Sequence, residues 1–291
     1  MVSVPAIAVD GIAASRKRIP PFALFQPASV TEALELLAAW PAAVLHAGGI
    51  DLANRMKAGL VAPAVIALDR IGEMKGVVRC RDSVNIGAAV THWQIEHDSV
   101  VKSCLPAVAA YVAGLGNVRV RVQGTIGGNI MAAEPGYEIL ALLAALDANL
   151  HFARRSDGTR YAVEARGFQP AISAAADILL MISLPLHPTD LKWTREMRPN
   201  LGIVASLNRD GDSIRSGYGA VTGQVTAGSR LGITQSLSQR EIAARARELA
   251  ESWAACIPIA DTPSGADAIY MRHVMAVLMR RLLIGMSGQD R

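Results

Sequence analysis

Two short stretches of this 291-residue sequence combine adjacent glycines with a following helical pattern. The first, HAGGIDLANRMKAG, begins at His46, and the second, GTIGGNIMAAEPGYE, begins at Gly124. A glycine pair permits positive φ and leaves backbone N–H groups uncovered by side chains. When such a pair leads into a helix, the unpaired N–H groups of the first turn add partial positive charge. Both stretches therefore favour the close approach of an anion to the main chain.

Neither glycine pair is decisive alone, because a single pair is also typical of a tight turn. We expect Gly48-Gly49 between a strand and a helix, and Gly127-Gly128 before an apolar helix that starts at Ile139. Two such places in one domain favour a diphosphate over a single phosphate. Neither pair matches G-x-G-x-x-G or carries G-K-[ST], which disfavours a Rossmann fold and a P-loop.

The hydrophobic pattern predicts a first region of mixed strands and helices. Helices are predicted to begin at Ser29 and Thr91, each followed three residues later by Glu or Gln in the spacing of a capping box. The other expected elements are strands over 42–47, 63–69 and 83–90, a helix over 103–116, and a hairpin turning at Asp157-Gly158.

The pattern changes near residue 177. A strand runs to Pro185, a second hairpin turns at Asp210-Gly211, and amphipathic helices follow over 239–257 and 266–283. Strands followed by helices are typical of an α+β domain. The predicted division is an N-terminal arm over 1–20, a first domain over 21–178 and a smaller C-terminal α+β domain over 179–291.

Composition disfavours several classes of protein. Hydrophobic residues make up 51% and charged residues 19%, as in globular chains. Aromatic residues are only 4% and the net charge of +4 is scattered, which disfavours a nucleic-acid surface. The apolar runs are shorter than the roughly 20 residues of a membrane span. Three separated cysteines without C-x-x-C disfavour a zinc or iron–sulfur site and, without a signal-peptide pattern, predict a cytoplasmic protein.

Side chains suited to acid–base or nucleophilic chemistry are scarce. His46 is expected to pack at a strand end, and His92 and His97 have the wrong spacing for a metal pair on one helix face. Cys104 is expected to begin a helix, either as a small buried side chain or as a more reactive thiol. We therefore assign no catalytic residue and no metal ligand. This scarcity fits a chain in which a bound cofactor carries the chemistry.

At the two glycine stretches the sequence resembles the FAD-binding medium subunit of molybdenum hydroxylases, of the carbon monoxide dehydrogenase and xanthine dehydrogenase type. AGGIDL…MK over 47–57 and VRVQGTIGGNI…EPGYEILALLAALDA within 118–148 resemble that family's two FAD-diphosphate segments. PFALFQPASVTEALELLA, DILLMISLPL and DTPSGADAIYMRHVMAVLMRRLL extend the resemblance over most of the chain. It implies an α+β protein with an FAD-binding domain of the vanillyl-alcohol-oxidase/p-cresol-methylhydroxylase type. A smaller C-terminal α+β domain of the carbon monoxide dehydrogenase flavoprotein type would follow.

The resemblance also implies an FAD site. The two glycine segments would wrap the diphosphate, and Glu138 takes the place of an acidic residue that binds the adenosine ribose hydroxyls. Lys57 would lie beside the cofactor, with Leu180 and Lys192 near the flavin ring. Asp51 stands where many members have serine, and a carboxylate there would repel a diphosphate unless it is turned away or caps the helix. The implied cofactor-binding set is Ala47, Gly48, Gly49, Ile50, Asp51, Leu52, Lys57, Thr125, Ile126, Gly127, Gly128, Asn129, Glu138, Leu180 and Lys192.

In that family the substrate is hydroxylated at a molybdenum cofactor on a large subunit, and electrons cross 2Fe-2S clusters on a small subunit to reach FAD. The resemblance thus implies an electron-transfer oxidoreductase subunit of a heterotrimer, with these two subunits as partners and an external electron acceptor. Two alternatives remain open. One is a self-sufficient FAD-dependent reductase of the same fold, which needs a proton donor near the flavin and a substrate lid. The other is a non-catalytic assembly scaffold whose glycine turns bind nothing.

Overall fold

The computed structural model describes residues 19–134, 136–170, 177–187, 189–196, 201–222, 227–259 and 268–287. Most of the predicted N-terminal arm, and the first residues of the last predicted helix, lie outside these ranges. The N-terminal region runs through β1 (Ala23–Phe25), α1 (Val30–Ala39), β2 (Val44–His46), α2 (Ile50–Lys57), β3 (Ala64–Ala67), the 3-10 turn η1 (Gly72–Met74), β4 (Val77–Arg79), β5 (Ser83–Gly87), α3 (His92–His97), α4 (Ser99–Cys104), α5 (Pro106–Ala113), α6 (Val118–Gln123), α7 (Ile126–Met131), α8 (Ile139–Ala145), β6 (Asn149–Ala153), β7 (Arg160–Glu164) and β8 (Ile178–Pro185). The C-terminal region runs through β9 (Thr189–Glu196), β10 (Leu201–Asp210), β11 (Ser213–Thr222), β12 (Ala227–Arg230), β13 (Leu237–Ser238), α9 (Gln239–Cys256) and α10 (Ala268–Met286).

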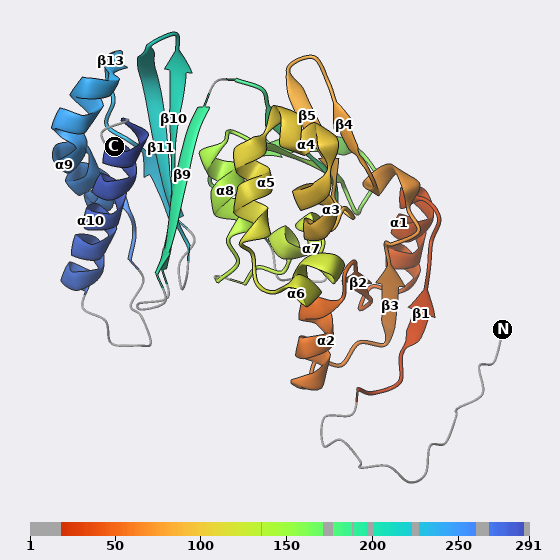
Figure 1. Cartoon of the computed structure of the whole chain (residues 1–291). Coiled ribbons are helices and arrows are strands. Elements are labelled where there is room, and N and C mark those ends of the chain that lie inside the picture. The colour runs from red at the N-terminus through yellow and green to blue at the C-terminus, as the bar shows by residue number, and fades with distance from the viewer. Residues whose placement is uncertain are drawn as a thin grey trace.

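A small parallel sheet in the order β1-β3-β2 begins the fold (Figure 1). Its central strand β3 is buried along its whole length, as expected for a strand between two others with both faces covered. The predicted cap of α1 is present, because the Ser29 side chain accepts a hydrogen bond from the Glu32 N–H. The Glu32 carboxylate returns to the N–H of Ala28 at 2.7 Å, one residue before the position that a capping box predicts. These short βα units place the first glycine pair directly after β2.

The second sheet is antiparallel, in the order β4-β5-β8-β6-β7, and helices α3 to α8 lie between β5 and β6 in the chain. The capping box predicted at Thr91 is confirmed at the start of α3. The helix predicted over 103–116 is instead two helices, because Pro106 has no N–H with which to continue α4 and begins α5. Cys104 therefore ends a helix rather than beginning one.

Strand β8 pairs with β5 on one side and β6 on the other, so it belongs to the sheet of the N-terminal region. The division predicted between residues 178 and 179 falls just inside this strand. We therefore propose that the two domains divide after β8.

The C-terminal sheet has the order β12-β11-β10-β9, with β13 also paired to β11. Different parts of the molecule cover its two faces. The alternating side chains of strand β10 show this. Ile203, Ala205 and Leu207 join the core with α9 and α10, whereas Val204 joins the core of the N-terminal region. Figure 1 shows the sheet between α9 and α10 on one side and the N-terminal region on the other. The predicted turn at Asp210-Gly211 is confirmed between β10 and β11.

Candidate cofactor site

The first glycine segment (residues 47–52) lies at the switch from β2 to α2, as predicted. Gly49 is the N-cap residue of α2 and has the left-handed conformation, with φ of 76°. A Cβ atom at Gly49 would also overlap the imidazole Nε2 of His46. The position thus requires glycine for backbone conformation and for space, since other residues rarely adopt positive φ.

This first segment presents unused hydrogen-bond donors. Within the described part of the chain, the backbone N–H groups of Gly48, Gly49, Ile50 and Asp51 have no hydrogen-bond acceptor. The four groups follow one another into the first turn of α2, where the helix adds its partial positive charge. An anion with several oxygen atoms would satisfy these donors.

The second glycine segment (residues 124–129) differs from the prediction. The apolar helix predicted from Ile139 is confirmed as α8, but Gly127 and Gly128 lie inside a further short helix, α7, that precedes it. Their N–H groups are already bonded, that of Gly127 to the Ala88 carbonyl at 2.9 Å and that of Gly128 to the Thr125 hydroxyl at 3.1 Å. A Cβ atom at Gly127 would lie 2.7 Å from the Ala88 carbonyl oxygen. Glycine here permits close packing rather than uncovered donors.

The structure brings the two glycine segments into contact. A Cβ atom at Gly48 would overlap the carbonyl oxygen of Gln123 and would lie 3.1 Å from the Gly124 Cα. A Cβ atom at Gly128 would lie 3.8 Å from the Ala47 Cβ. The segments are about 75 residues apart in the chain, so this contact is a property of the fold that neither motif contains by itself. It assembles one site from two sequence motifs.

Buried polar atoms without partners gather around this contact. Four such side-chain atoms occur in the described residues, and three are His46 Nδ1, His92 Nδ1 and Asn129 Oδ1. Asn129 lies in the second segment, and His46 packs beneath Gly49 of the first. His92 packs on Gly124, and burial, followed by the charge of Arg121, lowers its pKa to about 4. Unpartnered buried polar atoms are costly, so their concentration here indicates that a polar ligand completes the site.

Asp51 is turned toward partners of its own. Its Oδ2 lies 2.6 Å from Arg55 Nε, and its Oδ1 accepts a hydrogen bond of 3.5 Å from the Tyr137 hydroxyl. Burial, and then the neighbouring carboxylates of Asp51 and Glu134, raise the pKa of the Tyr137 phenol. Arg55 also donates through Nη2 to the Ala132 carbonyl at the end of α7. Asp51 thus has partners within the protein, and its relation to a diphosphate stays a prediction.

Glu138 lies just before α8 and is held by the C-terminal region. Its Oε2 lies 2.6 Å from Nε of Arg195, which comes from β9. The Arg195 guanidinium stands 4.4 Å over the Tyr111 ring and donates to the Tyr111 carbonyl at 3.1 Å. Burial, and then the charge of Glu138, raise the pKa of the Tyr111 phenol. The proposed contact of Glu138 with ribose remains a prediction, but the structure shows that an arginine already fixes its carboxylate.

Two other predicted residues, Lys57 and Leu180, have only an indirect relation to the glycine segments. Lys57 is exposed at the last position of α2, and the helical rise puts it roughly 10 Å from the first turn. The Leu180 side chain is buried in the core, while its carbonyl accepts from the N–H of Ala88 at 2.9 Å. The Ala88 carbonyl in turn accepts from the N–H of Gly127, so two successive backbone hydrogen bonds join Leu180 to the second segment.

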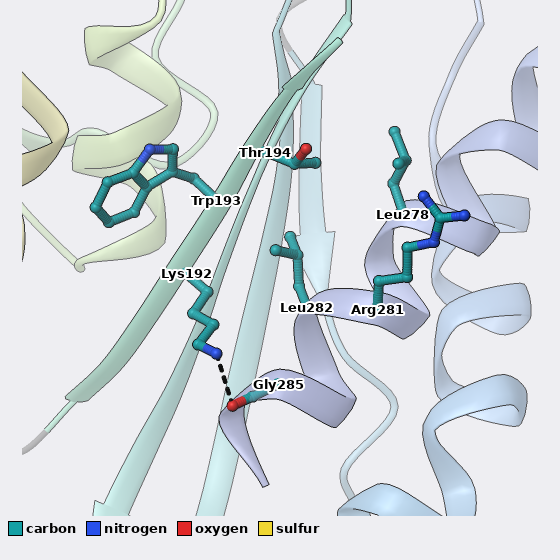
Figure 2. Close-up of a pocket in the computed structure, with 7 residues that line it drawn as sticks. All are labelled: Lys192, Trp193, Thr194, Leu278, Arg281, Leu282 and Gly285. Carbon is teal, nitrogen blue, oxygen red and sulfur yellow. Dashed lines mark hydrogen bonds between the residues drawn. The ribbon is translucent and has the colours of Figure 1, made fainter. Parts of the chain in front are cut away.

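Lys192 is not brought to the glycine segments. Its ammonium group donates to the Gly285 carbonyl at 2.7 Å, on the face of β9 that meets α10 (Figure 2). Its neighbour Trp193 packs against the core of the N-terminal region, because successive side chains of a strand point to opposite faces. Lys192, Arg281 and apolar residues of α10 line a cavity of about 270 Å³. The placement of Lys192 near the flavin ring stays a prediction.

Three residues of the site were not assigned from the sequence. Arg55 follows Asp51 by four residues in a predicted helix, which is the spacing of an ion pair and was therefore detectable. Tyr137 and Arg195 carry no local signal, because their partners lie 86 and 57 residues away.

The described residues contain neither a cluster suited to a metal ion nor a helix suited to a membrane. No group of three or more His, Cys, Asp or Glu side chains in those ranges is arranged to bind a metal ion. Within the same ranges, every helix is too short or too polar to cross a membrane.

The family model described as the FAD binding domain in molybdopterin dehydrogenase matches residues 20–187, which is more than half of the chain. The chain therefore belongs to this family, and its N-terminal region is an FAD-binding domain. Both the resemblance noted in the sequence and the assignment of FAD to this chain are confirmed.

Curated relatives match over similar segments. The chain is 27% identical over 181 residues to caffeine dehydrogenase subunit beta of Pseudomonas sp. (strain CBB1), covering 60% of this chain and 61% of that protein. It is 31% identical over 185 residues to the carbon monoxide dehydrogenase medium chain of Hydrogenophaga pseudoflava, covering 61% and 64%. The matched segment thus spans less than two thirds of the length of these relatives.

Solved structures extend the similarity of fold into the C-terminal region. Quinoline 2-oxidoreductase from Pseudomonas putida 86 superposes with a TM-score of 0.80 at 20% identity, over 93% of this chain and 98% of that one. Carbon monoxide dehydrogenase from Hydrogenophaga pseudoflava superposes with a TM-score of 0.79 at 23% identity, over 91% and 96%. The predicted α+β fold is therefore confirmed.

Proposed function

We propose that this chain is the FAD-binding electron-transfer subunit of a multi-subunit molybdenum hydroxylase. The observation that carries the proposal is the contact of Gly48 with Gln123 and Gly124, which assembles one site from two glycine segments inside the FAD-binding domain. Two adjoining segments suit a diphosphate, and FAD is the diphosphate that the family binds.

The residues present fit that ligand. The unpaired N–H groups of Gly48, Gly49, Ile50 and Asp51 would donate to the diphosphate oxygens. The buried side-chain oxygen of Asn129 would accept from a hydroxyl or N–H group of the cofactor, and Glu138, fixed by Arg195, would accept from the ribose hydroxyls. When bound, FAD supplies the redox chemistry, since flavins exchange electrons with donors and acceptors of several kinds. The chain itself would bind, orient and partly bury the cofactor.

The proposed partners are a small 2Fe-2S subunit and a large molybdenum-cofactor subunit, on which substrate is oxidised. Support comes from the two curated relatives, which are named as a beta subunit and a medium chain, and thus as parts of larger assemblies. This chain would receive electrons from the iron–sulfur clusters and pass them to an external acceptor.

Expressing the chain alone and together with its genomic neighbours tests the proposal. The isolated chain should be yellow, should hold one FAD non-covalently, and should exchange electrons with artificial donors and acceptors without oxidising organic substrates. Co-expression should yield a complex that turns over a substrate. Turnover by the isolated chain would favour the self-sufficient reductase, and a chain that stays colourless after FAD addition would favour the scaffold.

A further inference from the structure

Asp51 places a carboxylate in the first turn of α2, among the backbone donors proposed for the diphosphate. The helix N-terminus favours this charge, but a diphosphate bound to the same turn would be repelled by it. An acidic residue at this position therefore needs a neighbouring positive charge if a diphosphate is to bind.

Arg55 supplies that charge through a defined geometry. Its Nε lies 2.6 Å from Asp51 Oδ2, and its Nη2 donates to the Ala132 carbonyl, so the guanidinium is fixed from two sides. A partner four residues further along the helix draws the carboxylate toward the second turn. The fork of the guanidinium suits this double contact better than a lysine ammonium would.

The pair is not explained by stability alone. The side chains of Arg55 and Asp51 are 35% and 28% exposed, and ion pairs with this much solvent around them contribute little to folding. The pair joins Asp51 in the first turn of α2 to Arg55, which bonds to the end of α7, and this position gives it a consequence for ligand binding instead.

We propose that Arg55 is a specificity-determining residue that neutralises Asp51 and so permits a phosphorylated flavin to bind beside that carboxylate. The proposal rests on the proposed FAD site. It requires that removal of Arg55 weaken the binding of FAD more than the binding of riboflavin, which lacks phosphate. It also requires that the loss disappear when the carboxylate is removed as well.

The test is an equilibrium titration of the full-length apoprotein with FAD and with riboflavin, followed by flavin fluorescence. The variants are Arg55→Met, Asp51→Asn and the double variant, with circular dichroism to check folding. Arg55→Met should weaken FAD binding roughly tenfold, Asp51→Asn should tighten it because the repelling charge is removed while Arg55 and the backbone N–H groups remain, and the double variant should return close to the wild type. Riboflavin affinity should change by no more than about twofold in any of them.

Ionic strength gives an independent measurement. In Arg55→Met, added salt should tighten FAD binding by screening the repulsion from Asp51, whereas the wild type should show less of this effect. Equal losses for FAD and riboflavin, or a double variant no better than Arg55→Met, would overturn the proposal in favour of a packing role through Ala132. If Arg55→Met does not fold, Asp51→Asn decides, because a selective loss of FAD affinity there would also overturn it. A wild-type protein that binds no FAD would instead overturn the proposed function itself.

Discussion

The glycines of residues 47–52 and those of residues 124–129 both stand at the first turn of a helix, yet their backbone N–H groups are used in opposite ways. In the first segment the N–H groups of Gly48 and Gly49 have no acceptor among the described residues. In the second, those of Gly127 and Gly128 bond to Ala88 and to the Thr125 hydroxyl. The first segment keeps these N–H groups free for a ligand, whereas the second uses them within the protein.

This difference shows that a glycine pair has two separable uses. The absence of a Cβ uncovers donors at Gly48 and Gly49, and it allows backbone to approach backbone at Gly127 and also at Gly48. The second use makes the first possible, because the packed second segment forms the surface on which Gly48 rests. Substitutions in the two segments should therefore fail in different ways.

The largest effect is expected for Gly48→Ala. The added methyl group would overlap the Gln123 carbonyl, so the two segments must separate, at a cost of about 3 kcal/mol or more. FAD binding should be lost, as measured by the flavin absorbance of the purified protein and by titration. Gly72→Ala is the matched control, because a Cβ there meets no atom within 4 Å, and it should keep its flavin. Equal flavin content in both variants would contradict the contact as the basis of the site.

The next effect is a pH dependence of stability caused by His92, which packs on Gly124 of the second segment. Burial holds the pKa of His92 at about 4, whereas the unfolded chain takes up the proton near its ordinary value of 6.5. Stability should thus be full above pH 6.5 and fall as pH drops toward 4, by about 2 to 3 kcal/mol between pH 7 and pH 4.5. Urea unfolding at the two pH values measures this. His92→Leu should remove that part of the loss, and an unchanged pH dependence in the variant would show that other groups cause it.

Gly127→Ala and Gly128→Ala separate packing from binding within the second segment. A Cβ at Gly127 would lie 2.7 Å from both the Ala88 Cβ and the Ala88 carbonyl oxygen, and we expect about 2 kcal/mol of destabilisation. A Cβ at Gly128 would lie 2.9 Å from the Thr125 hydroxyl oxygen and 3.8 Å from the Ala47 Cβ, so the Thr125 side chain must shift but no backbone need move, and we expect a smaller loss of about 1 kcal/mol. Thermal unfolding of the apoproteins measures the difference. The reverse order would contradict close packing against Ala88 as the reason for glycine at position 127.

The smallest effect is expected for Lys57→Ala. The side chain is exposed at the far end of α2 and has no hydrogen bond or ion pair within the described residues. Its removal should change stability and FAD affinity by no more than about 0.5 kcal/mol, as for most surface substitutions. A large loss of FAD affinity in the same titration would support the role beside the cofactor that the family resemblance implies for Lys57.

Features governed by neighbouring residues could be predicted from the sequence. The caps at Ser29 and Thr91 and the turn at Asp210-Gly211 were found because their partners lie within four residues. The split between α4 and α5 is equally local, since Pro106 marks it, but the apolar run across the proline predicted one continuous helix.

Features that depend on distant partners could not be predicted. The N–H of Gly127 is used by Ala88, and the carboxylate of Glu138 by Arg195, through contacts that only the assembled sheets create. The face of β9 on which Lys192 lies depends on the pairing of that strand with β10, where a shift of one residue would exchange the two faces. The glycine motifs predicted the kind of ligand but not the separate uses of the two segments.

Amide hydrogen exchange with and without FAD tests the central claim most directly, because unbonded N–H groups exchange rapidly and bonded ones slowly. Gly48, Gly49, Ile50 and Asp51 should exchange rapidly in the apoprotein and become protected when FAD binds. Ile126, Gly127 and Gly128 should be protected in both states, since their acceptors belong to the protein. The account would be contradicted if FAD protected the second segment and left the first unchanged.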